Sequence, residues 1–328
     1  MLAYLTNFSS SFLIALLVWP FLAFALTIPI LIIQYRRYNK LRPRRAVAVY
    51  LFILYGLGLI SFTLYPMPEN PAQFCLNYHL SPQLNPLAFI TDIQSDGARA
   101  ILQLAMNFLF FIPLGVFLRL LFRVRIWTAV IVSFLASLLI ETAQLTGGFG
   151  MYPCGYRLFD VDDLLINTIG GTVGYLLASL LPRRELAVAA RDEVVRQPGI
   201  VRSVTAFLID SASLVMLNIV LVLAAYLVFG REFALDARDF LPIISLVIIF
   251  GIAPYICRGF SLGSVLVRLN LDDKKRIWWR RLLYYATRTL LAIFILLPPY
   301  DYTLLSIAAI VYVMLVWWRH HKLPYQFI

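Results

Sequence analysis

Charged side chains are scarce in this chain of 328 residues: they make up 14% of it, against 61% for hydrophobic residues, and the mean hydropathy is +0.82. Soluble domains carry about 25% charged residues, so the composition excludes an ordinary soluble protein. Among the charged residues, the 17 Asp and Glu are fewer than the 28 Lys and Arg. The basic residues form short clusters between long apolar runs, which argues against nucleic acid as a partner. The composition predicts a membrane protein in contact with the lipid bilayer.

Motifs of several common catalytic chemistries are also missing. The chain contains no His-Glu-x-x-His, Gly-Lys-Ser/Thr phosphate loop or Cys-x-x-Cys. The topology described below separates His79 from His320 and His321, so the three histidines cannot share one site. We expect no metal and no cofactor. Catalysis, if there is any, would have to use carboxylates as general acid or base, and the sequence leaves open whether the chain is an enzyme.

Long apolar segments predict an all-α, polytopic membrane protein. A helix needs roughly 20 apolar residues to cross the hydrocarbon core. Nine segments approach that length: 11–33, 46–65, 100–118, 127–145, 161–181, 203–229, 240–257, 282–298 and 303–318.

The basic residues predict the orientation of these spans. If the cluster from Arg36 to Arg45 is cytoplasmic, alternation places 23 of the 28 Lys and Arg residues inside. Positive charge concentrates in cytoplasmic loops, and an error of one span would reverse every later loop. We therefore expect the N-terminus outside and the C-terminus inside.

A charged interval bounded by proline divides the chain. Residues 183–200 lie between Pro182 and the sixth predicted span and predict a cytoplasmic linker with a short helix. We expect a five-helix membrane domain over residues 1–182 and a four-helix membrane domain over residues 201–328.

Two of the three cysteines fall in loops that the predicted topology places outside. Cys75 and Cys154 are therefore expected to form a disulfide in an oxidising compartment, although two unpaired thiols are the alternative. Cys257 lies near the inner end of its span and should remain a thiol.

Polar residues in three consecutive spans converge at the predicted outer face. Polar groups in lipid cost free energy, so they normally face a protein interior or an aqueous cavity. Glu141 and Gln144 lie three residues apart on one helical face. The seven residues predicted to form a substrate-binding cluster are Asn107, Glu141, Gln144, Arg157, Asp160, Asp163 and Asn167.

Structural alternatives exist for each group in this cluster. Glu141 can pair with Arg157, stay protonated or bind a cation. The aspartates, Asp162 among them, can cap the following helix. The asparagines can hydrogen-bond between helices and hold the bundle together.

Beyond these arguments, residues of the first half resemble the VanZ-like family over about residues 10–182. The matching patterns are Asn107-x5-Pro113-x-Gly115, Glu141-x-x-Gln144, Arg157-x-x-Asp160-x-x-Asp163-x3-Asn167-x-x-Gly170 and, as a variant, Asn85-Pro86-Leu87. This resemblance implies a bacterial plasma-membrane protein associated with reduced susceptibility to teicoplanin and related glycopeptides. A lipid-linked cell-wall precursor or the glycopeptide itself is then the expected partner.

An acidic and a basic residue share one depth near the predicted inner face of the second half. Asp210 lies about 10 Å below Arg202 along the sixth span, and Arg288 lies at a similar depth in the eighth. Because an unpaired buried ion is costly, we expect Asp210 and Arg288 to form a structural ion pair.

Arg202, Asp210 and the segment Gly259-Phe-Ser-Leu-Gly263-Ser264 resemble the RDD family. Ser264 departs from that family's usual Lys, and its terminal His-Asp segment is missing. Ion transport, proposed for some relatives, is a weaker implication here.

Overall fold

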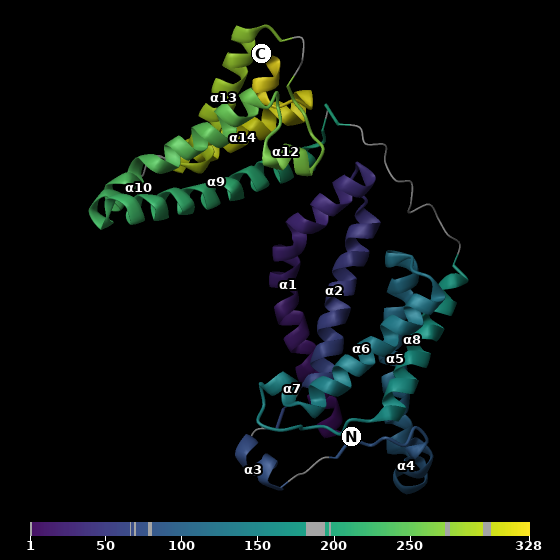
Figure 1. Ribbon diagram of the computed structural model, residues 1–328. Coiled ribbons are helices and arrows are strands. Elements are labelled where there is room, and N and C mark those ends of the chain that lie inside the picture. Colours follow the sequence, from purple (N-terminus) through teal and green to yellow (C-terminus); the bar gives the residue numbers. More distant parts are fainter. Residues whose placement is uncertain are drawn as a thin grey trace. The chain divides into compact units, whose positions relative to one another are not determined.

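The computed structural model describes residues 2–65, 67–68, 70–77, 81–181, 194–196, 198–272, 276–297 and 303–328, and these ranges contain helices and no strand. They fold into two compact units (Figure 1): one formed by Met1–Leu26 and Arg42–Leu186, the other by Thr27–Leu41 and Ala187–Ile328. Most of the predicted linker, residues 183–193, lies outside the described residues, as does His79.

Each of the nine predicted segments contains a helix. The nine helices are α1 (Leu2–Tyr38), α2 (Pro43–Leu64), α5 (Ala98–Phe117), α6 (Ile126–Leu145), α8 (Val161–Ser179), α9 (Ile200–Phe229), α10 (Arg231–Leu246), α13 (Trp278–Leu296) and α14 (Thr303–His320). Short π-helical segments extend α5 to Phe122 and continue α10 through Ile252.

Among the described residues, six helices are long and apolar enough to cross a membrane: α1, α2, α5, α6, α9 and α10 with its extension. The other three predicted spans are less apolar or shorter, each for a reason visible in its sequence. Asp162 and Asp163 lower the hydropathy of α8, α13 begins with Trp278-Trp279-Arg280-Arg281, and the apolar part of α14 is shorter. A count of nine spans and the sidedness of the termini therefore remain predictions.

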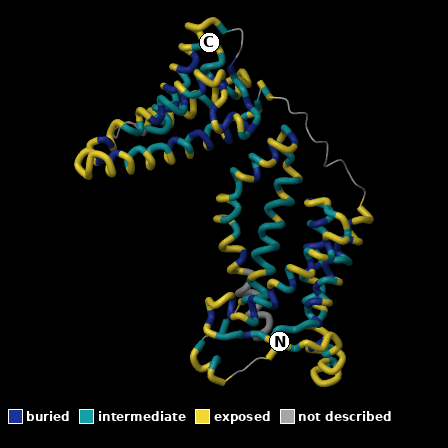
Figure 2. Tube along the Cα trace, in the orientation of Figure 1, coloured by how far each residue is buried: buried dark blue, intermediate teal, exposed yellow. Residues whose placement is uncertain are grey.

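Apolar side chains on many helices face outward. Phe21 and Phe24 of α1 are 79% and 84% exposed, and exposed positions recur along α9 (Figure 2). Soluble monomers rarely expose contiguous apolar surface of this kind. These surfaces are compatible with contact with the lipid bilayer.

In the first unit, α5 packs closely against α8. A Cβ at Gly170 or Gly174 of α8 would clash with the backbone carbonyl of Phe108 or Ile112 in α5, so only glycine permits this approach. Phe111 and Tyr175 are buried in the adjoining core. The close packing fixes the register of the two helices that carry Asn107 and Asp163.

The loops that precede α8 are tied to the rest of the first unit. Cys75 of α3 (Pro71–Asn77) and Cys154 form the predicted disulfide, with Cα atoms 5.8 Å apart. The hydroxyl of Tyr156 donates to the carbonyl oxygen of Leu64 at 3.0 Å. The disulfide ties the segment that contains Arg157 to α3, and the Tyr156 hydrogen bond ties it to the end of α2.

The second unit includes the last part of α1, which the sequence assigned to the first domain. Tyr35 of α1 is buried in a core with Ala206, Ile209 and Val267. The guanidinium of Arg202 donates to the side-chain oxygen of Asn39 at 2.9 Å. Contacts of this kind bring residues 27–41 into the second unit, although they precede the predicted boundary by more than 140 residues.

Candidate functional site

The predicted outer cluster lies where α5, α6 and α8 meet, at the end of α6 and the start of α8. The side-chain amide of Asn107 donates to Oδ1 of Asp163, with N and O 2.6 Å apart. Both side chains are half-buried. This hydrogen bond joins α5 to α8 one residue before Phe108, whose carbonyl group lies against Gly170.

Glu141 makes a different contact from the ion pair with Arg157 that was one alternative. Its carboxylate is 2% exposed, and Oε2 accepts a hydrogen bond from the backbone N–H of Asp160 at 3.0 Å. Asp160 is the N-cap of α8, and its Oδ1 accepts from the N–H of Asp162 at 3.3 Å. Asp162 itself is buried in the first turn. Glu141 thus holds the end of α6 against the cap of α8.

The remaining amides of the cluster bridge helices. Gln144 donates to the carbonyl oxygen of Thr63 in α2 at 2.7 Å, and Asn167 donates to the hydroxyl of Ser137 in α6 at 2.9 Å. Both amide side chains are buried. Oδ1 of Asn167 is buried without a partner in the described residues, which leaves one unused acceptor inside the cluster.

Gln83 is a member of this site that the sequence analysis missed. Its N–H donates to the carbonyl oxygen of Phe159, its carbonyl oxygen accepts from Val161, and its side-chain amide reaches Oδ1 of Asp160 at 3.2 Å. Gln83 lies in a loop without periodicity, two residues before Asn85. Only its closeness to the Asn85-Pro86-Leu87 segment could have drawn attention to it.

Acidic groups dominate the electrostatics of the cluster. Burial, followed by the neighbouring Asp162 and Asp163, raises the pKa of Asp160 to about 8. Arg157 is the cation whose charge acts on Glu141 and Asp163. Within the described part of the chain, the half-buried Arg157 forms no ion pair or hydrogen bond, so its donors remain available to a ligand.

The structure therefore divides the seven predicted residues. Asn107, Glu141, Gln144, Asn167, Asp160 and Asp163 all hydrogen-bond to other parts of the protein. Arg157 alone among the seven makes no hydrogen bond or ion pair within the described residues. The described residues contain no group of three or more His, Cys, Asp or Glu side chains arranged to hold a metal ion.

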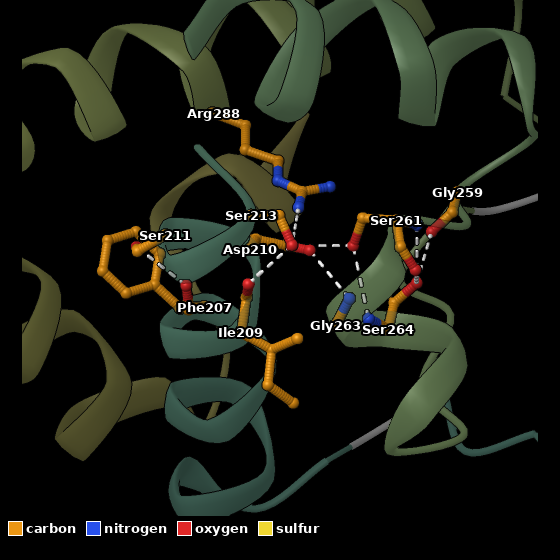
Figure 3. A network of polar contacts seen from close by, with 10 residues as sticks. All are labelled: Phe207, Ile209, Asp210, Ser211, Ser213, Gly259, Ser261, Gly263, Ser264 and Arg288. Atoms are coloured by element: carbon orange, nitrogen blue, oxygen red, sulfur yellow. Dashed lines mark hydrogen bonds and ion pairs between the residues drawn. The ribbon is translucent and has the colours of Figure 1, made fainter. Parts of the chain in front are cut away.

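A second polar network surrounds Asp210 in the other unit (Figure 3). Nη2 of Arg288 lies 3.2 Å from Oδ2 of Asp210, so the expected ion pair is present. The hydroxyl of Ser261 also donates to Oδ2 at 2.7 Å, and the N–H of Gly263 donates to Oδ1 at 2.8 Å. Both oxygens of this carboxylate, which is 1% exposed, are thus satisfied by protein groups.

Arg202 and Ser264, the other residues of interest in the second half, have separate roles. Arg202 lies over the ring of Tyr35, 4.6 Å from its centroid, and does not pair with Asp210. Ser264 and Ser261 form a capping box that begins the short helix α12 (Leu262–Leu266). Ser264 is therefore explained by local helix capping.

Residues 52–182 match the family model described as VanZ/LLP1. No curated protein and no solved structure matches the chain. The matched residues contain α5, α6, α8 and the loop with Arg157, and so all seven residues of the predicted cluster. Over residues 52–182 this helical membrane protein is therefore similar to the VanZ-like family, which is associated with glycopeptide resistance.

Proposed function

We propose that the first unit reduces susceptibility to teicoplanin-type glycopeptides by binding a polar group at the outer face of a bacterial plasma membrane. The observation that carries this proposal is the half-buried Arg157, which lies among carboxylates without an ion pair in the described residues. A guanidinium with free donors binds carboxylate or phosphate in a bidentate manner. The ligand is the anionic or peptide part of a lipid-linked cell-wall precursor, or of the glycopeptide itself.

The geometry gives the cluster two kinds of residue. Arg157 contacts the anionic group of the ligand, while Asp160 and Asp163 accept hydrogen bonds from its amides. Glu141 acts as a positioning residue because its carboxylate is occupied by the N–H of Asp160. Asn107 positions Asp163 in the same way.

Growth inhibition by teicoplanin tests this function in cells that express the full chain. Arg157→Ala should abolish protection at unchanged membrane abundance. Arg99→Ala is the matched control, because Arg99 is also predicted to lie outside but is exposed at the start of α5. Full protection in the Arg157 variant would refute the proposal.

The outward position of the cluster can be tested separately with Cys257, an exposed free thiol. In the predicted orientation this residue is near the inner face. A membrane-impermeant maleimide should label it only after the cells are permeabilised. Labelling of intact cells would contradict the predicted orientation, on which the outward position of the cluster rests.

An enzyme that modifies an outer-leaflet precursor is the second candidate. The observation in its favour is Asp160, whose pKa of about 8 keeps it protonated at neutral pH, as a general acid requires. Mass spectrometry of envelope precursors separates this candidate from binding alone. A precursor pool that does not change on expression counts against catalysis.

Transport by the second half is a third candidate, motivated by the resemblance to the RDD family and by the ion pair of Asp210 with Arg288. Three protein donors already satisfy the Asp210 carboxylate, which favours a structural role. Proteoliposome ion flux that is unaffected by Asp210→Asn would argue against transport.

A further inference from the structure

Two cavities of opposite character occur in the second unit. The first, of about 330 Å³, is lined mainly by apolar side chains of α9, α13 and α14, among them Phe207, Leu291 and Met314. The second, of about 530 Å³, is polar. Its charged and imidazole-bearing lining residues are Arg196, Asp272, Arg276, His320, His321 and Lys322.

The two cavities adjoin along the C-terminal segment. Leu271 lines both of them. In the segment that contains the 3-10 helix η3 (Pro324–Phe327), Leu323 and Tyr325 line the apolar cavity, while Lys322 and Gln326 line the polar one. One short stretch of chain therefore separates an apolar chamber from a cationic chamber.

The polar cavity carries an excess of positive charge. Asp272 is the acidic residue among its described lining residues, and Arg281 and Arg276 already pair with it at 2.8 and 3.4 Å. Arg196 has no ion pair within the described ranges. Nε1 of Trp317, which also lines this cavity, is buried without a hydrogen-bond acceptor there. The exposed Arg196 and the indole N–H can both donate to an anionic group in this cavity.

We propose that the second unit binds an anionic phospholipid of the inner leaflet, with its phosphate in the cationic cavity and an acyl chain in the apolar cavity. An amphiphile is the occupant because the two cavities adjoin and differ in polarity. The inner leaflet is its source because the predicted topology places α14 and the C-terminus inside, where anionic headgroups attract basic residues. The proposal does not depend on the function of the outer cluster.

Native mass spectrometry of the full chain in neutral detergent tests this site. The probes are phosphatidylglycerol, phosphatidylcholine with the same chains, and inorganic phosphate. Phosphatidylglycerol should bind at least ten times more tightly than either of the other two. Equal affinity for the two lipids, or phosphate bound as tightly as phosphatidylglycerol, would overturn the proposal.

Variants locate the lipid. Arg196→Gln and Lys322→Gln should each weaken phosphatidylglycerol binding several-fold. Met314→Trp fills the apolar cavity and should weaken it as well. Arg319→Gln is the matched control, because Arg319 is exposed on α14 and lines neither cavity. Equal losses in Arg196→Gln, Lys322→Gln and Arg319→Gln would show that the basic surface binds lipid without a site and would contradict the proposal.

Because Met314→Trp can also disturb folding, its unfolding midpoint is compared with that of the unaltered protein. Leu315→Trp, at a neighbouring position on α14 that is equally exposed but lines neither cavity, controls for the added ring. Loss of lipid binding in Met314→Trp alone, at an unchanged midpoint, supports an acyl chain in the apolar cavity. The same loss in both variants contradicts it.

Discussion

The backbone N–H of Asp160 donates a hydrogen bond to Oε2 of Glu141, and the two atoms lie 3.0 Å apart. This contact joins the last turn of α6 to the N-cap of α8. A carboxylate in a membrane bundle is expected to serve a ligand, a cation or an ion pair. In this protein it orients the segment that contains Arg157.

The first prediction separates positioning from ligand binding at Glu141. Glu141→Ala leaves the N–H of Asp160 without its acceptor and should lower the free energy of unfolding by about 1.5–3 kcal/mol, with loss of protection. Glu141→Gln keeps an acceptor oxygen and should retain most of the stability and most of the protection. Thermal unfolding in detergent and teicoplanin susceptibility measure the two effects. Equal loss of protection in both variants, at unchanged stability, would assign Glu141 to the ligand instead.

The second prediction concerns pH. The pKa of Asp160 rises from 3.8 to about 8 on folding, mainly through burial and then through Asp162 and Asp163. The folded protein keeps this proton where the unfolded chain has lost it, so this contribution to stability is complete below about pH 4 and declines as the pH rises through 8. Asp160→Asn still caps α8 and should flatten the decline in the unfolding midpoint. An unchanged slope in this variant would contradict the assignment.

The third prediction tests the contact between α5 and α8. Gly174→Ala places a Cβ against the carbonyl of Ile112 and should lower the free energy of unfolding by about 1–3 kcal/mol, because backbone atoms cannot move aside cheaply. Gly56→Ala in α2 meets no atom within 4 Å and is the matched control. It should leave stability unchanged or raise it slightly. Similar midpoints for the two variants would mean that the helices are not closely packed.

The fourth prediction concerns the buried ion pair. Arg288→Met leaves the carboxylate of Asp210 uncompensated and should lower the free energy of unfolding by about 3–5 kcal/mol. Adding Asp210→Asn should recover most of the lost stability, because asparagine is uncharged and its side-chain oxygen can still accept from the N–H of Gly263. Arg280→Met, at an exposed position of α13, should have little effect. If the two changes are simply additive in the double variant, the pair does not contribute as a unit.

Hydropathy and charge made a large part of the architecture predictable. A long apolar run in lipid must satisfy its backbone internally, so each of the nine segments contains a helix. The cost of a lone buried ion likewise anticipated the contact of Asp210 with Arg288, and loop topology anticipated the disulfide of Cys75 with Cys154. These inferences depend on strong local penalties that a single sequence makes visible.

Other features depend on tertiary contacts that leave no periodic signal. The last part of α1 packs in the second unit because Tyr35 and Asn39 contact Arg202, which is more than 160 residues away in the sequence. Gln83 meets Asp160 from an irregular loop. The partner of Glu141 is a backbone N–H, a donor that every residue except proline carries. Such partners become apparent only when the chain is folded.

The central claim is that Arg157 binds the polar part of an envelope ligand. Its most direct test is a binding titration of the purified full chain in lipid nanodiscs with teicoplanin and, separately, with a lipid-linked cell-wall precursor. The account predicts saturable binding of at least one of them that weakens ten-fold or more in Arg157→Ala and is unchanged in Arg99→Ala. Failure of both ligands to bind, or equal binding by the two variants, would contradict it.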